Sequence, residues 1–188
     1  RIDSRFLEPA CGDGNFLAEI LARKLAVVKR KYKRSAHDYE INAILALSSI
    51  YGVDILLDNA IACRQRLFEI WDKEYVTVCK KQCRTDTREA AKFILSRNIV
   101  CGNALTLMCV DENGQDTTEP IVFSEWAFIT KAKMQRKDYT FDELLNGKRD
   151  ETLKETQGEL FAEEAPPDEE GKFLKQYISD YRRIQDNG

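Results

Sequence analysis

The sequence predicts an α/β protein with a doubly wound, mainly parallel sheet that carries helices on both faces. Short apolar runs alternate with longer segments in which apolar residues recur every three or four positions, as in a series of strand–helix units. The first apolar run also passes through a glycine-containing turn directly into such a segment. Together, the alternation and the turn favour parallel strands joined by helical crossovers.

Four short apolar runs are the expected strands of this sheet. They cover residues 6–7, 50–54, 99–103 together with the exit turn, and 120–124. Four segments have the apolar spacing of helices that bury one face. They cover residues 15–32, 38–49, 56–79 and 85–96.

One stretch after the third expected strand allows two interpretations. Residues 105–110 and 121–128 flank Asn113-Gly114, which is a strong hairpin turn signal. Either the two runs pair as an antiparallel ribbon, or only the second run is a strand of the main sheet.

These elements define an expected domain at residues 1–145. Residues 146–172 are acidic and contain Pro166-Pro167, which indicates a flexible linker. Residues 173–188 carry apolar side chains at helical spacing and predict a C-terminal amphipathic helix that docks on the domain or on a partner. The chain opens at Arg1, almost on the first expected strand, so we expect it to be a piece of something longer.

Composition excludes several classes of protein. The chain of 188 residues is 43% hydrophobic and 32% charged, and it has neither a signal peptide nor an apolar run long enough for a bilayer. It has six cysteines but only one histidine, and their spacing does not match a zinc site. We therefore expect a cytoplasmic protein with reduced thiols, with no metal and no membrane partner.

The formal net charge of −3 hides a division of charge along the chain. Residues 155–170 hold seven acidic side chains and no basic one, whereas residues 23–34 hold seven basic side chains and no acidic one. The basic run could follow a nucleic-acid backbone. It could equally be a solvated helix end, where cations also favour the C-terminal helix dipole.

The most informative stretch is residues 6–14, Phe-Leu-Glu-Pro-Ala-Cys-Gly-Asp-Gly, which runs directly into the first expected helix. An acidic residue ends the strand, and two glycines provide positive φ angles and room for a ligand to approach the backbone. Such a turn presents N–H groups and a carboxylate to a nucleotide-like ligand. A purely structural strand–helix turn is the alternative. No Gly-Lys-Ser/Thr follows, and the third glycine of a dinucleotide fingerprint is missing.

The amino-acid sequence of this turn resembles the cofactor loop of S-adenosylmethionine-dependent methyltransferases. It is most similar to that of the adenine-N6 DNA methyltransferases of restriction–modification systems. The resemblance covers roughly residues 5–125 and implies a class I methyltransferase (Rossmann-like) fold with S-adenosylmethionine as cofactor. It implies a cofactor-binding role for Glu8, Pro9, Ala10, Cys11, Gly12, Asp13, Gly14, Asn15 and Phe16. Glu8 and Asp13 would repel a pyrophosphate but suit the cationic amino group and sulfonium of this cofactor.

Asp54 is the second strong feature, because it ends an apolar run about forty residues after the glycine turn. An acid at such a place can accept both ribose hydroxyls of an adenosine, whereas the alternative is an exposed acid at a strand end. The run Tyr-Gly-Val-Asp-Ile resembles the corresponding strand of DNA adenine methyltransferases. The resemblance implies that Ile55 packs on the adenine ring.

Asn103 and Ala104 follow the third expected strand. The resemblance implies that Asn103 contacts the adenine amino group, where the family usually has aspartate, and that Ala104 beside it also belongs to the cofactor-binding residues. Asparagine still offers a carbonyl acceptor for this contact. The alternative is an asparagine that serves only the turn after Gly102.

The catalytic motif of the family is not found in this sequence. Adenine-N6 methyltransferases carry a polar residue and Pro-Pro-aromatic after the fourth strand, to hold a base that has been flipped out of the duplex. At the expected place this chain has Phe-Ser-Glu-Trp, and Pro166-Pro167 is followed by Asp168. We expect Ser124 to take the polar role and Trp126 to stack on the base. The alternative is that Trp126 is a core or interface aromatic.

Three functions follow from these features. The first is an S-adenosylmethionine-dependent adenine-N6 DNA methyltransferase, the methylase component of a restriction–modification system that works with a restriction or specificity subunit. The second is a catalytically degenerate relative that binds cofactor or DNA as a partner subunit. The third is methyl transfer to RNA, protein or a small molecule. A second basic cluster, at residues 131–137, could touch DNA beside Trp126, or it could be a solvated loop.

Overall fold

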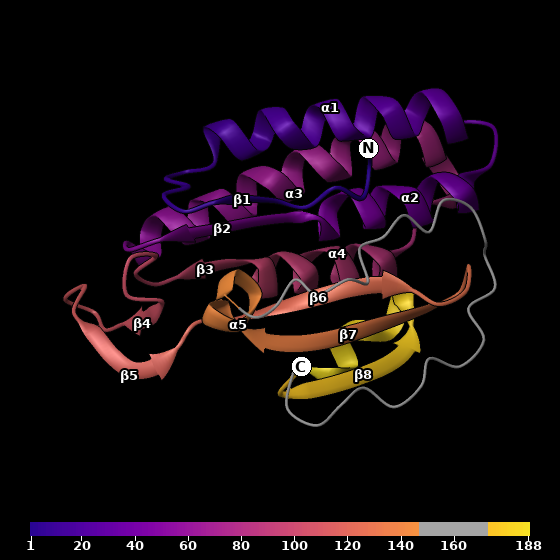
Figure 1. The fold of residues 1–188 in the computed structure, drawn as a ribbon. Coiled ribbons are helices and arrows are strands. Elements are labelled where there is room, and N and C mark those ends of the chain that lie inside the picture. Colours follow the sequence, from indigo (N-terminus) through magenta and orange to yellow (C-terminus); the bar gives the residue numbers. More distant parts are fainter. Residues whose placement is uncertain (147–172) are drawn as a thin grey trace.

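The computed structural model describes residues 1–146 and 173–188, so all but the first residue of the predicted linker lies outside the described residues (Figure 1). A parallel sheet holds β1 (Phe6–Glu8), β2 (Ile50–Asp54) and β3 (Ile99–Cys101) in the order β1-β2-β3. Between these strands run α1 (Asn15–Tyr32), α2 (Ala36–Ser48), α3 (Leu57–Cys79), the short 3-10 helix η1 (Lys80–Gln82) and α4 (Thr85–Asn98). These bounds confirm the four predicted helices and three of the predicted strands.

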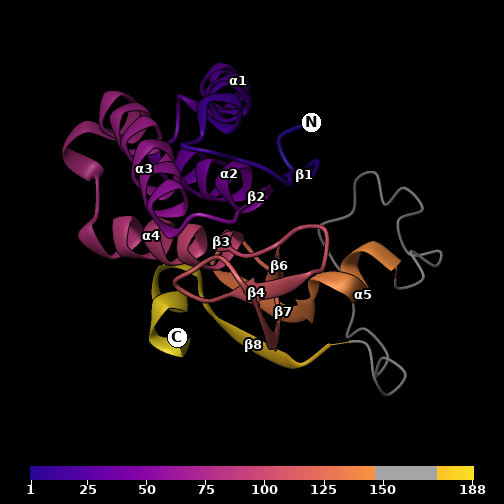
Figure 2. The ribbon, with the colours of Figure 1, turned by 90° about the vertical axis from the view of Figure 1, so that its left-hand side faces the viewer.

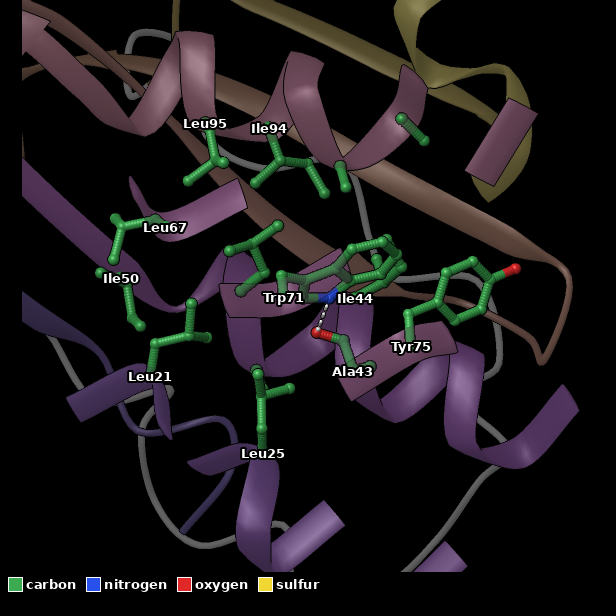
Figure 3. Close-up of a cluster of buried hydrophobic side chains, with 14 of the residues drawn as sticks. Leu21, Leu25, Ala43, Ile44, Ile50, Leu67, Trp71, Tyr75, Ile94 and Leu95 are labelled. Carbon is green, nitrogen blue, oxygen red and sulfur yellow. Dashed lines mark hydrogen bonds between the residues drawn. The ribbon is translucent and has the colours of Figure 1, made fainter. Parts of the chain in front are cut away.

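The four long helices lie on one face of the parallel sheet and bury a common core there (Figures 1 and 3). Trp71 of α3 lies at its centre and donates a hydrogen bond from Nε1 to the carbonyl oxygen of Ala43 on α2, at 3.1 Å. Ile50 of β2 belongs to this core. Because strand side chains alternate between faces, Tyr51 and Val53 point to the opposite face.

The opposite face is covered by strands and a short helix rather than by crossover helices. Ile121, Phe123 and Phe141 pack there against Tyr51 and Val53. They come from the chain around β6 (Val122–Phe128) and from α5 (Phe141–Asn146). Figure 2 shows the long helices on one side of β1–β3 and α5 on the other.

The predicted doubly wound, mainly parallel sheet of class I methyltransferase (Rossmann-like) type is therefore wrong. The described residues form three small sheets, of which only the first is parallel. The second pairs β4 (Met108–Val110) with β5 (Asp116–Pro120), and the third orders β6, β7 (Lys133–Thr140) and β8 (Lys175–Asp180) as an antiparallel sheet. After β3 the chain reverses through hairpins, whereas a further parallel strand needs a crossover connection.

The fourth predicted strand, at residues 120–124, is divided between the end of β5 and the start of β6. Neither interpretation of residues 105–110 and 121–128 is correct, because each run contributes a strand, β4 and β6, and neither strand belongs to the parallel sheet. The two runs do not pair with each other, because β4 pairs with β5 and β6 pairs with β7. The hairpin turn at Asn113-Gly114 joins β4 to β5.

The predicted C-terminal amphipathic helix at residues 173–188 is also wrong. Residues 175–180 form β8, which pairs antiparallel with β7, and the 3-10 helix η2 (Tyr181–Asn187) follows. Tyr177 and Ser179 are the more buried residues of β8, which is the two-residue period of a strand. The open edge of β7 attracts this segment because a strand there satisfies backbone N–H and C=O groups.

The C-terminal segment is held to the helical layer by a buried carboxylate. Glu40 of α2 accepts hydrogen bonds from Tyr75 of α3 and from Thr87 of α4. It also accepts bonds from Tyr181 and Arg182 of η2. Four segments of the chain therefore meet at one side chain, and the charge of Glu40 is paired with that of Arg182.

Candidate functional site

The loop between β1 and α1 is fastened to the end of β2. The N–H of Cys11 donates to the carbonyl oxygen of Val53, and the N–H of Gly12 donates to Oδ2 of Asp54, each at 2.9 Å. These bonds bring the glycine turn and Asp54 together at the carboxyl edge of the parallel sheet. The edge where the C-terminal ends of parallel strands meet is the usual ligand-binding place in open α/β sheets.

The two glycines of the loop have different surroundings. Gly12 has φ +55°, and a Cβ built there would meet no atom within 4 Å. Gly14 has φ +93°, and a Cβ there would lie 2.8 Å from Sγ of Cys63 on α3. Gly12 therefore faces open space, which a ligand can enter, whereas Gly14 packs tightly against the protein.

Asp54 already has three protein donors. Gly12 donates to Oδ2, while the N–H of Leu56 at 2.9 Å and Nδ2 of Asn59 at 3.1 Å donate to Oδ1. A carboxylate offers about four lone-pair positions, so one remains on Oδ2. Asp54 can accept one ribose hydroxyl without rearrangement. It can accept the second hydroxyl if that hydroxyl replaces the side-chain amide of Asn59 at Oδ1.

The two other predicted carboxylates flank the loop. Glu8 is half-buried at the end of β1 and accepts a bond from the N–H of Ala10 at 3.3 Å, while Pro9 and Ala10 are exposed. Asp13 forms an ion pair with Arg66 of α3 at 3.3 Å. Arg66 also donates to Oδ1 of Asn15 and so ties the loop to α3.

Apolar side chains line the rim of this edge. Phe16 is 50% exposed and Ile55 is 45% exposed, although both are large apolar residues. Leu56, Leu57 and Ile61 continue the exposed apolar surface along the start of α3. Gly114, in the β4–β5 turn, lies close to Ile55. An adenine ring is a flat, largely apolar group that such a rim suits.

Asn103 does not have the free acceptor that the resemblance implies. Its Oδ1 accepts hydrogen bonds from the N–H groups of Leu105 and Thr106, at 2.9 and 3.3 Å. Its Nδ2 donates to Asp116 at 3.1 Å. Both lone pairs of the amide oxygen are used within the turn, so the alternative of a turn asparagine fits this residue. Ala104 is half-buried against the cluster around Tyr51.

Ser124 and Trp126, the expected catalytic residues, lie in the interior. Ser124 is 0% exposed, donates to Asp138 of β7 at 2.6 Å and accepts from Arg97 of α4 at 3.1 Å. Trp126 is 7% exposed, and its Nε1 donates to Oδ1 of Asn98 at 2.9 Å. We correct the catalytic assignment of both residues, because neither side chain can reach a base from its buried position.

The second basic cluster is divided between the exposed β6–β7 turn, which holds Lys131, and the strand β7. Lys133, Arg136 and Lys137 are residues of β7. Arg136 is buried and forms an ion pair with Asp138 at 3.0 Å, and its guanidinium lies 4.1 Å from the ring centroid of Tyr177. Arg136 therefore holds β7 and β8 together rather than contacting a ligand.

A pair of thiols lies beneath the glycine loop. Cys11 of the loop and Cys63 of α3 are buried and share a hydrogen bond, which raises the pKa of Cys11 and lowers the pKa of Cys63. All six cysteines are free, as the sequence predicted.

Two broader searches of the described residues complete the description. Among residues 1–146 and 173–188, no three His, Cys, Asp or Glu side chains gather as they would around a metal ion. Within the same residues, no helix combines the length and the apolar character needed to cross a membrane.

Comparison of the chain with protein-family models, with curated proteins and with solved structures gave no match. Any function of the candidate site is therefore inferred from its sequence and geometry alone.

Sequence reasoning did not identify three residues that shape the site. Asn59 and Arg66 of α3 hold Asp54 and Asp13, and Cys63 supports the loop from below. An aspartate just before a helix commonly accepts bonds from the N–H groups that follow it, which predicts the bond from Leu56 but not the side-chain bond from Asn59. The contacts of Arg66 and Cys63 span about fifty residues of sequence and leave no local signal.

Proposed function

We propose that the chain is the cofactor-binding part of an S-adenosylmethionine-dependent DNA methyltransferase of the adenine-N6 type, such as the methylase component of a restriction–modification system. The cofactor lies at the carboxyl edge of the parallel sheet, between the glycine loop and the end of β2. The observation that carries this proposal is the junction of Gly12 and Asp54, where an open backbone position meets a carboxylate.

The surroundings of this junction fit the cofactor in three respects. The open space at Gly12 lets a ligand touch the loop backbone, and no side chain caps the N-terminus of α1. The N–H groups of the first turn are then available to the carboxylate of the methionine moiety. Asp54 offers an acceptor to the ribose, and Phe16 and Ile55 offer apolar contact to the adenine.

Charge at this edge also suits a cation. Glu8, Asp13 and Asp54 all lie at or beside the loop, and of these Asp13 is neutralised by Arg66. The remaining negative charge attracts a sulfonium and an ammonium group and repels a phosphate. When bound, S-adenosylmethionine supplies a methyl group on an activated sulfur, so the protein has mainly to hold and align the reactants.

The burial of Ser124 and Trp126 favours the second function, a partner subunit that binds cofactor or DNA without catalysis of its own. In that case the residues that hold the target adenine come from another subunit, such as a restriction or specificity subunit. Both functions belong in the cytoplasm, where DNA, the cofactor and reduced thiols occur together.

Calorimetric titration of S-adenosylmethionine into the whole chain tests cofactor binding. We expect saturable binding by the wild type and a loss of at least about tenfold for Asp54→Ala, which is about 1.4 kcal/mol. Asn59→Ala is the matched control, because it removes a neighbour of Asp54 but frees an acceptor, so its affinity stays within about threefold. A folded wild type that does not bind, or an Asp54→Ala variant that binds as the wild type does, would overturn the proposal.

Transfer of a labelled methyl group to unmethylated DNA separates the two functions. If the chain is a partner subunit, it transfers no label by itself, although it binds the cofactor. Label on adenine in a reaction with the isolated chain would exclude the partner-subunit function. Label on RNA or protein alone would exclude DNA as the substrate.

A further inference from the structure

The end of the molecule opposite the glycine loop is strongly basic. Eight basic residues from three segments meet there, and we call them the amino-edge patch: Lys29, Arg30, Lys31, Lys33, Arg34, Lys80, Lys81 and Lys131. All eight side chains belong to exposed residues. Figure 1 shows the end of α1, the start of α2 and the β6–β7 turn at this end of the molecule.

Contacts around the first turn of α2 bring the three segments together. The chain leaves α1 through a short turn in which Ser35 caps α2. Cys79, next to Lys80 at the end of α3, donates from Sγ to the carbonyl oxygen of Ala36 at 3.6 Å. Lys131 of the β6–β7 turn forms an ion pair with Asp38 of α2 at 3.6 Å. These contacts place the three segments of the patch next to one another around the first turn of α2.

Most of this charge is not neutralised by ion pairs among the residues that the structure describes. Apart from Lys131, the residues of the patch form no ion pair with any residue in the described ranges 1–146 and 173–188. The dipole of α1 explains cations in its last turn, where Lys29, Arg30 and Lys31 lie. That dipole acts only at the end of α1, so it does not explain Lys131, which lies in the β6–β7 turn.

We propose that the amino-edge patch binds the phosphate backbone of double-stranded DNA. Five of its cations fall within residues 29–34, a density that suits a ladder of phosphates rather than a single anionic group. The choice of DNA as the partner rests on the proposed function. The charge of the patch is observed independently of that function. Contacts to phosphates carry no sequence information, so the patch holds DNA without selecting a site.

The position of the patch defines its relation to the cofactor edge. The 18 residues of α1 separate the two ends, which corresponds to about 27 Å at 1.5 Å per residue. That length corresponds to about eight base pairs of duplex. DNA that is bound to the patch therefore contacts this chain well away from the base that the cofactor would methylate. The target base has to come from a neighbouring stretch of the same duplex.

Fluorescence anisotropy with a labelled duplex of about 20 base pairs, without cofactor, tests the patch at about 50 to 200 mM salt. The variant replaces Lys31, Lys33, Arg34 and Lys131 by Gln. The control replaces Lys73, Lys92, Lys175 and Arg183 by Gln, which are also exposed and change the net charge equally. Because both variants carry the same net charge, a difference between them reports the position of the charges.

We expect the wild type to bind with an affinity that falls steeply with salt. The patch variant should lose at least about tenfold in affinity, and its slope of log K against log[salt] should be shallower by about 2 to 4, since each phosphate contact contributes about 0.9. The control should keep the wild-type slope. Lys33→Gln/Arg34→Gln replaces the fourfold variant if the latter fails to fold, with a change in slope of up to about 2.

Three results would overturn this inference. They are absence of DNA binding by the wild type, an equal effect of the patch and control variants, and binding to phosphatidylserine vesicles in place of DNA. Titration of S-adenosylmethionine into the patch variant keeps this test apart from the proposed function. In the patch variant, intact cofactor binding with lost DNA binding supports both proposals. In the wild type, DNA binding without cofactor binding supports the patch and refutes the cofactor site.

Discussion

At the scale of single residues, the two glycines of the β1–α1 loop serve different purposes. Both have positive φ angles, which other residues adopt only at a cost. Gly12 faces open space, and Gly14 lies against Cys63. A methyl group added at the first enters the space of a ligand, whereas one added at the second enters the protein itself.

Alanine substitution separates these two purposes. Gly12→Ala should cost about 1 kcal/mol of stability from its backbone angle and should weaken S-adenosylmethionine binding at least about tenfold. Gly14→Ala should cost more, about 2–4 kcal/mol, because strain at φ +93° adds to a contact of 2.8 Å. Urea denaturation and calorimetric titration measure the two effects. Equal stability losses, with cofactor affinity unchanged in Gly12→Ala, would contradict the assignment.

At the scale of elements, the helices and the first three strands are predictable because their signals are local. A period of three or four in the apolar residues marks each helix, and each parallel strand is a short apolar run. The meeting of Gly12 and Asp54 is also foreseeable, because the carboxyl ends of parallel strands lie at one edge of a sheet.

The antiparallel sheet could not be predicted in the same way, because β7 hides its strand pattern. Its inward residues are Met134, Arg136 and Asp138, so two of three buried positions are charged. The two charges compensate each other as an ion pair, which only the folded structure shows. Without β7 as a recognisable partner, the sequence places β6 in the parallel sheet and favours a catalytic role for Ser124 and Trp126, which are in fact buried.

Substitutions in β6 test whether these residues belong to the core. Trp126→Phe should cost about 1–2 kcal/mol, because Oδ1 of Asn98 loses its donor in a buried place. Trp126→Ala should cost about 3–5 kcal/mol from the lost packing. S-adenosylmethionine affinity should remain unchanged in Trp126→Phe. A variant with wild-type stability but impaired methyl transfer would restore the catalytic assignment.

At the scale of the whole molecule, charge is separated between two ends. The carboxyl edge carries Glu8 and Asp54 beside the glycine loop, and the opposite end carries the amino-edge patch. A cationic cofactor and a polyanionic duplex are therefore attracted to different ends of the same domain. Because exposed charges are screened by salt, the attraction of DNA should weaken with ionic strength more than that of the cofactor.

Glu40 also links the helical layer to the C-terminal segment. Glu40→Ala leaves the buried donors of Tyr75, Thr87 and Tyr181 and the partly exposed donor of Arg182 without their acceptor, and it should cost about 3–5 kcal/mol. Glu19→Ala is the control, since its exposed pair with Arg23 should contribute no more than about 0.5 kcal/mol. Urea denaturation measures both, and a loss below about 1 kcal/mol for Glu40→Ala would show that this cluster contributes little to stability.

The contact between Glu40 and Tyr181 also bears on the order in which the chain folds during its synthesis. These residues are separated by 141 positions, so α2 leaves the ribosome long before η2 has been synthesised. Contacts at such separation close late in folding, because the loop between them has to be ordered first. Until residue 181 arrives, a nascent chain carries a charged side chain on α2 that lacks two of its four partners. Chains whose synthesis stops before that point should be recognised by chaperones and proteases as incompletely folded.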